Sequence, residues 1–319
     1  MTAHSFEAVF GHERPLKVLK RALSSGRLPQ AYLFWGPAGV GKELVAREAA
    51  RVLLCMDAEA CGRASACGTC PACRQIDAGN HPDLHVLVAK GSSISIQEIR
   101  ALKEALSYRA FERGRKVAIL RDSFRMTREA GNALLKLLEE PPSDTYLFLL
   151  AHQRSQLIPT LVSRCQALRF DPLSREELRR LLLSRGVAED ASERLAEFAG
   201  GCPGTALAEE PEALGRLEQE VVEAWGALDP ERGSTAAERF SLSDRWAKDK
   251  DRLGARLDRL EVELHRRIRE GARGVGEASL LANLEGVFHV RRLLELNVNA
   301  QLALDSFFLG FLRGDWEIP

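Results

Sequence analysis

The stretch GPAGVGKE, residues 36–43, has most of the features of a phosphate-binding loop. Such a loop holds nucleotide phosphates with backbone N–H groups and a lysine, and a Ser or Thr after the lysine holds magnesium. The glycines and the lysine of the pattern are present as Gly36, Gly39, Gly41 and Lys42. The next residue is Glu43, which has no hydroxyl and would repel phosphate. We therefore expect weak nucleotide binding or none; the alternative to a nucleotide site is a tight turn kept for packing.

The cysteines indicate a second kind of site. Of seven cysteines, five fall between residues 55 and 73, and such clustering in a cytosolic chain favours metal over disulfides. The stretch CGTCPAC, residues 67–73, holds two overlapping C-x-x-C pairs, so that three thiolates and a fourth upstream can complete a tetrahedral zinc shell. A shell filled by protein has no open position for a water nucleophile, so the zinc would be structural. Spacing alone leaves Cys55 and Cys61 open as the fourth ligand, and a redox pair is the competing interpretation.

Composition bounds the remaining possibilities. The chain has 319 residues, enough for two or three domains, and 45% of them are hydrophobic. The 45 basic and 45 acidic residues cancel, so net charge gives no hint of a nucleic-acid or membrane partner. No apolar run approaches the length of a membrane span, and the N-terminus has no apolar signal region. We expect a cytoplasmic protein that does not interact with membranes.

Short apolar runs alternate with helical patterns up to residue 170. The expected strands are residues 31–35, 84–88, 116–120, 146–150 and 166–170. This alternation predicts a parallel sheet covered on both faces, with 84–88 as a buried strand and the phosphate loop at the carboxyl end of the first strand. Helix starts are marked by Thr127 and by two capping boxes, Ser95 with Glu98 and Ser174 with Glu177.

Beyond residue 170 the pattern is helical. The predicted architecture is an α/β domain that includes the cysteine module, then a small helical bundle, then an all-helical domain, over residues 1–170 (module about 55–73), 171–208 and 209–319. The last domain contains a highly charged segment, residues 245–270, which predicts a solvated helix face over an apolar stripe.

Taken together, these stretches resemble the bacterial clamp-loader proteins of the AAA+ class, and most of all their delta prime type. The resemblance covers residues 6–170 almost continuously, and GGCPGTAL (200–207) extends it. NALLKLLEEPP (132–142) and SRC (163–165) are its most specific parts. It implies an AAA+ P-loop domain with a zinc-binding insertion, a helical lid and a helical collar for oligomerisation. The C-terminal third is similar only in being helical.

The resemblance also assigns individual residues. In this family the first zinc ligand ends the helix after the phosphate loop, which implies the set Cys55, Cys67, Cys70 and Cys73. Cys61 stays an alternative, because the gap from Cys55 to Cys67 is longer than expected for the family. The tripeptide Ser163, Arg164 and Cys165 implies an arginine finger, supplied in trans, that contacts the γ-phosphate held by a neighbouring subunit. An ordinary surface arginine is the competing interpretation.

Measured against hydrolysing members, the nucleotide site has lost parts. The strand end that should carry an acidic pair reads Arg121-Asp122, and an arginine cannot hold Mg²⁺. The polar sensor position is His152, and the lid arginine is replaced by Thr205. Together with Glu43 these changes predict that hydrolysis is lost.

Together with these losses, the resemblance implies a non-hydrolysing subunit of a pentameric clamp-loader ring in DNA replication. Its implied partners are the tau or gamma subunits, the delta subunit, the sliding clamp indirectly, and primer–template DNA, which Lys103, Arg109 and Arg113 could face. One alternative is an active tau/gamma-like ATPase, in which Asp122 would serve both acidic roles. Another is a zinc-stabilised binding module outside replication.

Overall fold

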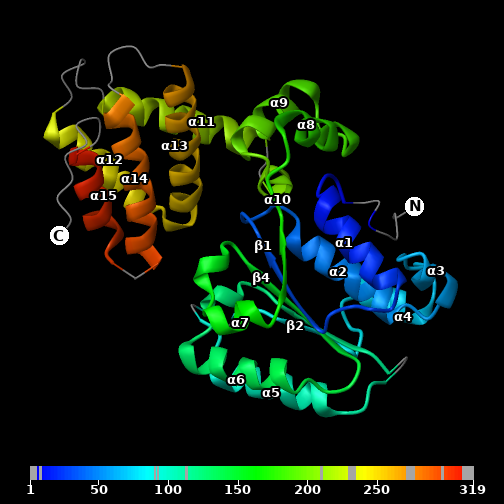
Figure 1. Cartoon of the computed structure of the whole chain (residues 1–319). Helices are drawn as coiled ribbons and strands as arrows, with labels where there is room; N and C mark the ends of the chain where they lie inside the picture. Colours follow the sequence, from blue (N-terminus) through cyan, green and yellow to red (C-terminus); the bar gives the residue numbers. More distant parts are fainter. Residues whose placement is uncertain are drawn as a thin grey trace. The chain divides into compact units, whose positions relative to one another are not determined.

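The computed structural model describes residue 6 and residues 9–89, 91, 93–111, 114–208, 211–228, 235–270, 277–295 and 298–310. The chain divides into two compact units, residues 1–208 and 209–319, which are described separately below. Figure 1 shows the sheet in the first unit and the helices of both.

A five-stranded parallel sheet forms the centre of the first unit. Its strands are β1 (Ala31–Trp35), β2 (Leu84–Leu87), β3 (Lys116–Leu120), β4 (Thr145–Ala151) and β5 (Gln166–Arg169). They lie in the order β2-β3-β4-β1-β5, and every neighbouring pair is parallel. The three inner strands are nearly continuous apolar runs because helices cover both of their faces. The predicted α/β fold class is confirmed.

One strand differs from its prediction in its burial. The run at 84–88 was expected to be a buried strand, but β2 lies at the edge of the sheet, ends at Leu87, and is only half-buried along its length. An apolar run cannot distinguish an inner strand from an edge strand, because the number of neighbours is decided by the topology.

Helices cover the two faces of the sheet (Figure 1). One apolar cluster joins α1 (Glu13–Ser24), α2 (Lys42–Leu54) and α4 (Pro71–Asp77) to one face, and the short α3 (Ala58–Gly62) lies between α2 and α4 in the chain. A second cluster joins α5 (Ile96–Ser107), α6 (Arg128–Glu139) and α7 (Pro159–Ser163) to the opposite face. Alternate residues of a strand feed the two clusters, as the pleat requires.

Local capping signals fix several helix starts. Ser95 and Glu98 form the predicted capping box of α5, and Ser174 and Glu177 form that of α8 (Arg175–Ser184). Thr127 caps α6 by accepting the N–H of Ala130. The 3₁₀ turns η2 (Ser123–Arg125) and η3 (Arg154–Gln156) follow β3 and β4, and α9 (Glu189–Phe198) and α10 (Pro203–Ala208) complete the first unit.

In the part of the second unit that the structure describes, every regular element is a helix. They are α11 (Pro211–Leu228), α12 (Ala236–Lys248), α13 (Lys250–Glu270), α14 (Glu277–Glu295) and α15 (Ala300–Gly310). The charged segment 245–270 breaks at Asp249 and then forms α13. As predicted, α13 packs an apolar stripe into the core, formed by Leu253, Leu257, Leu260 and Leu264. Among the described helices, none is both long and apolar enough to cross a bilayer.

Candidate functional site

The phosphate loop connects β1 to α2 at the carboxyl edge of the sheet. Gly36 needs its hydrogen side chain, because a Cβ there would lie 2.1 Å from the carbonyl oxygen of Phe170. Gly41 occupies the N-cap of α2 with φ 110°, a conformation that side-chain-bearing residues rarely adopt. The glycines are therefore accounted for by backbone geometry alone, and they carry no evidence of a bound nucleotide.

Lys42, the residue that would contact phosphates, is turned onto its own loop. Its Nζ donates hydrogen bonds to the carbonyl oxygens of Gly36 at 2.5 Å and Pro37 at 2.6 Å. The residue is only 8% exposed, and burial lowers the pKa of its ammonium group to about 8. A phosphate would have to compete with these two carbonyl groups for the lysine.

Two of the altered positions form an ion pair with each other. Arg121, at the end of β3, places its Nε 3.0 Å from Oε2 of Glu43, in the first turn of α2. Oε1 of Glu43 accepts a hydrogen bond from Nε of Arg47 at 2.9 Å. By the family pattern these two positions should supply the hydroxyl and a carboxylate for magnesium. Here the carboxylate is neutralised by arginines, and their charge repels a divalent cation.

Asp122, the remaining carboxylate of the expected acidic pair, faces His152. Its Oδ1 lies 3.7 Å from Nε2 of that histidine, whose ring rests against Phe124 with centroids 4.7 Å apart. The substitution at the sensor position therefore adds a ring beside the carboxylate that would have to orient water.

The altered lid motif lies directly on the phosphate loop. The N–H of Gly204 donates to the carbonyl oxygen of Gly39 at 2.7 Å. A Cβ on Gly39 would come within 2.7 Å of Oγ1 of Thr205, and a Cβ on Gly204 would come within 2.9 Å of Cα of Gly39. The loop and α10 thus meet backbone to backbone, and the position expected to carry an arginine presents a short hydroxyl side chain.

Sequence reasoning missed one residue of this site, His12. Its Nε2 lies 2.8 Å from the carbonyl oxygen of Val40 and must donate, because a carbonyl only accepts. Its ring packs edge-on against Phe170, and burial lowers its pKa below the ordinary value. No local signal could have identified it, since its partner is 28 residues away.

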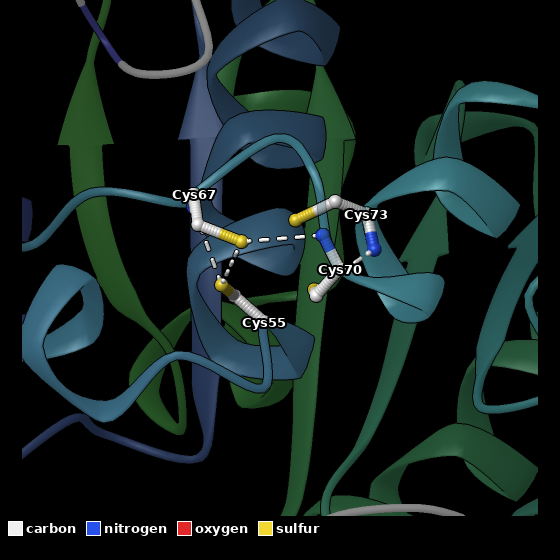
Figure 2. A group of neighbouring side chains, drawn as sticks. All are labelled: Cys55, Cys67, Cys70 and Cys73. Atoms are coloured by element: carbon white, nitrogen blue, oxygen red, sulfur yellow. Dashed lines mark hydrogen bonds between the residues drawn. The ribbon is translucent and has the colours of Figure 1, made fainter.

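Four cysteines gather beside α2 (Figure 2). The Sγ atoms of Cys55, Cys67, Cys70 and Cys73 all lie within 4.8 Å of one another. Cys55 caps the end of α2, and Cys70 caps the start of α4. The chain therefore places four thiol groups close enough together for one metal ion to bind all of them.

Backbone N–H groups point at the sulfur atoms of this cluster. Sγ of Cys55 accepts from the N–H of Cys67 at 3.3 Å, and Sγ of Cys67 accepts from the N–H of Cys70 at 3.4 Å. Burial opposes ionisation of Cys67, but backbone hydrogen bonds from Thr69 and Cys70 outweigh it and lower the pKa of this thiol to about 6. Burial raises the pKa of Cys55 to about 11 and also raises that of Cys73. A bound metal would instead hold all four as thiolates.

Cys61 lies outside this four-sulfur group. Its Sγ is 3.2 Å from the carbonyl oxygen of Val52 and 3.4 Å from that of Cys55. The geometry therefore favours Cys55 as the fourth metal ligand.

The SRC tripeptide ends α7 and leads into β5. The hydroxyl of Ser163 donates to the carbonyl oxygen of Thr160 at 3.0 Å, and Cys165 packs against the apolar core, where burial raises the pKa of its thiol to about 12. Arg164 extends outward, and its side chain is 39% exposed. Its Nη2 lies 2.6 Å from Oε1 of Glu139, and its Nη1 donates to the carbonyl oxygen of Thr160 at 3.1 Å. The flanking residues thus anchor the turn, and the arginine remains at the surface.

The structure says little about the three residues considered for DNA contact. Lys103 and Arg109 are exposed, on α5 and just after it. Arg113 lies outside the described residues. The structure adds no contact that would assign them a role.

Known proteins are similar to the first unit and, in some cases, to nearly the whole chain. A family model described as "DNA polymerase III, delta subunit" matches residues 11–174. The DNA polymerase III subunit delta' of Bacillus subtilis is 28% identical over 325 residues, covering 94% of this chain and 96% of that protein. The DNA polymerase III subunit tau of Escherichia coli is 32% identical over 309 residues, but these cover 92% of this chain and only 44% of that longer protein.

Among solved structures, a DNA polymerase III gamma subunit-related protein from Thermotoga maritima has a similar fold. Its TM-score is 0.51 at 19% sequence identity, covering 94% of this chain and 99% of that one. At this identity the similarity shows the fold alone.

Proposed function

Because this chain belongs to the family of DNA polymerase III delta subunits, we propose that it is a non-hydrolysing, delta prime-type member of the clamp loader that supplies Arg164 to a neighbouring ATPase. The proposed loss of hydrolysis rests on one observation, the Glu43–Arg121 ion pair. The side chains at the two positions that should bind Mg²⁺ pair with each other instead. They therefore do not offer ligands to the ion that phosphoryl transfer requires.

The arrangement around this pair supports the same conclusion. Lys42 is bonded to the carbonyl groups of its own loop, and Gly204 bonds to Gly39 where the lid meets that loop. ATP would have to displace these contacts and would find no metal site. An active tau/gamma-like motor is therefore not favoured. The similarity of this chain to a tau subunit is consistent with membership of the same kind of complex.

Arg164 is the catalytic residue of the proposal, acting in trans. It projects from a turn that Ser163 and Cys165 anchor. A guanidinium keeps its charge at all physiological pH values and can bond two phosphate oxygens at once. Such a finger raises the turnover of a neighbouring phosphoryl-transfer site by about 10³–10⁵-fold.

Similarity to both delta prime and tau subunits makes this chain a member of a clamp-loader complex with tau/gamma. We further propose a cytoplasmic, pentameric ring in which the helical unit at 209–319 forms part of the collar. The delta subunit and primer–template DNA would be further partners, and the sliding clamp an indirect one.

The four-cysteine cluster could hold a metal, and we propose structural zinc. Four thiolates are a common zinc shell, and closing it would tie the end of α2 to the start of α4. Cys55, Cys67, Cys70 and Cys73 would hold the ion, which would stabilise the fold and take no part in catalysis.

The proposal is tested first on the purified chain alone, by Mg²⁺-dependent ATP hydrolysis. We expect no turnover, and measurable turnover would identify a motor instead. The second test replaces Arg164 by Ala in the complex reconstituted with tau/gamma and delta subunits. ATP turnover at the neighbouring site should fall by roughly 10³-fold with assembly unchanged, because the γ-phosphate loses its cation. Unchanged turnover would refute the assignment of the finger.

A further inference from the structure

The guanidinium of Arg164 already has an anionic partner within its own chain. Glu139 accepts from Nη2 at 2.6 Å, and the carbonyl oxygen of Thr160 accepts from Nη1 at 3.1 Å. An arginine has five N–H donors in a planar fork that fits carboxylate and phosphate oxygens equally well. The carboxylate of Glu139 therefore has the same chemistry as the phosphate that the finger is expected to meet.

The fold brings this pair together by close helix packing. Glu139 is the last residue of α6, and Arg164 caps the end of α7. The two helices approach closely at Gly131, where a Cβ would lie 3.1 Å from Cδ1 of Ile158. Leu161 and Val162 then anchor α7 in the apolar core. The two helices thus pack against each other, and Glu139 and Arg164 meet although they are 25 residues apart in sequence.

The electrostatics make the pair exchangeable. A helix C-terminus carries partial negative charge, so the carboxylate of Glu139 stands at the end where an anion is disfavoured and a cation is attracted. The side chains of Arg164 and Glu139 are 39% and 49% exposed, and ion pairs this exposed contribute little to stability. A triphosphate in a neighbouring subunit could therefore displace Glu139 at small cost.

We propose that Glu139 is a positioning residue that occupies the guanidinium of Arg164 as a placeholder anion until the γ-phosphate of a neighbouring nucleotide replaces it. The use of the finger rests on the proposed function above, whereas the pairing itself does not. While Glu139 is bound, the finger is engaged only in the fraction of molecules in which the pair is open. The apparent affinity of the neighbouring site for ATP is the intrinsic affinity multiplied by that fraction.

The first test uses the full chain alone and needs no partner. Modification of Arg164 by phenylglyoxal is followed by mass spectrometry of the peptide that contains it. Glu139→Gln should raise the modification rate of Arg164 by about two- to fivefold, the range that loss of a half-exposed ion pair allows. Glu140→Gln is the matched control, since it removes the same charge one residue away from a carboxylate that is not paired with Arg164. Equal rates in both variants and the wild type would overturn the pairing.

The second test measures ATP hydrolysis in the reconstituted complex. Glu139→Gln should lower KM for ATP by about two- to fivefold with kcat unchanged, because the finger becomes available without a new contact in the transition state. Glu140→Gln should leave KM unchanged, which separates the specific pair from a general effect of negative charge. A Glu139→Gln complex with wild-type KM, or one with the same KM as the Glu140→Gln complex, would overturn the inference.

The two proposals fail in different ways. If Arg164→Ala leaves turnover unchanged, the proposed function fails, and the placeholder role fails with it whatever the phenylglyoxal result. If Arg164→Ala slows turnover but Glu139→Gln changes neither the modification rate nor KM, the finger stands and the placeholder does not. A change in both readouts for Glu139→Gln alone supports the placeholder.

Discussion

Two Arg–Glu pairs in the first unit have similar geometry, but their glutamates lie at opposite ends of their helices. Glu43 with Arg121 lies at the phosphate loop, and Glu139 with Arg164 lies at the SRC turn, with closest N···O distances of 3.0 and 2.6 Å. Both pairs are partly exposed to a similar degree. They differ in the helix end that carries the glutamate. Glu43 is in the first turn of α2, where an anion is favoured, whereas Glu139 ends α6, where it is disfavoured.

The two pairs also differ because Glu43 has a second cationic partner. Glu43 also bonds Arg47, one turn further along α2, so its carboxylate is held from two sides. The carboxylate of Glu43 thus has two cationic partners, and in the proposed function this pair stands where a metal ion would bind. Glu139 pairs with Arg164 at a helix end where an anion is disfavoured, which fits the exchange of partners that we propose. The helix end that carries the glutamate distinguishes the two pairs more clearly than the N···O distance does, and we attribute their proposed roles to it.

Removing the first pair should have the largest effect. The double substitution Glu43→Thr with Arg121→Asp removes the pair and supplies a hydroxyl and a carboxylate for magnesium. We expect Mg²⁺-dependent ATP binding at least about tenfold tighter than in the wild type, measured by isothermal titration calorimetry. The matched control is Glu139→Thr with Arg164→Asp, which makes the same exchange in the other pair and should leave nucleotide binding unchanged. If the first double variant still binds no Mg²⁺-ATP, the Lys42 and Gly204 contacts, and not the ion pair, close the site.

The strands and the helix starts could be predicted because their causes are local. Apolar runs gave the strands of the sheet, and the Ser95 and Ser174 capping boxes lie within four residues of sequence. The edge position of β2 could not be predicted, since it depends on which strands become neighbours. The candidate site was predictable as a set of altered positions, because the resemblance placed them in one reaction centre.

The contacts between those positions were beyond sequence reasoning. Glu43 and Arg121 are far apart in sequence, and only the sheet topology brings the end of β3 to the start of α2. A signal was nevertheless present, since two substitutions of opposite charge fell at positions expected to share one metal ion. The Arg164–Glu139 pair gave no such signal, because Glu139 belongs to a stretch with two adjacent glutamates and only the structure selects one.

Metal removal should affect the two regions unequally. The cysteine cluster begins at the end of α2, the helix that carries Glu43, and Arg51 of α2 pairs with Asp77 of α4. If the cluster holds the zinc that we propose, chelation or Cys73→Ser should release it and lower Tm by about 5–10 °C, because its contribution to folding is lost. Hydrogen exchange should increase in α2 and α4 and stay unchanged in α6 and α7. Cys61→Ser is the control, and this variant should retain the metal. Loss of the metal from this variant would mean that Cys61 is a ligand.

The smallest expected effect is the pH response of the phosphate loop. Burial lowers the pKa of His12 below 6.5, outweighing its bond to Val40 and the carboxylates of Asp171 and Glu177. The unfolded chain therefore takes up the proton first as pH falls, so the stability from neutral His12 is present above pH 6.5 and is lost as pH falls through the folded-state pKa.

Denaturant titrations at pH 7.5 and 5.5 measure this loss against a His12→Asn variant, whose side chain tolerates the left-handed backbone but does not titrate. The wild type should lose more stability than the variant between the two pH values. Hydrogen exchange should increase at the phosphate loop and not in α6 or α7, neither of which contains a histidine. Equal losses in the two proteins would mean that the Val40 bond and the two carboxylates hold the charged ring as well as the neutral one. In that case burial would not be the dominant influence on the pKa of His12.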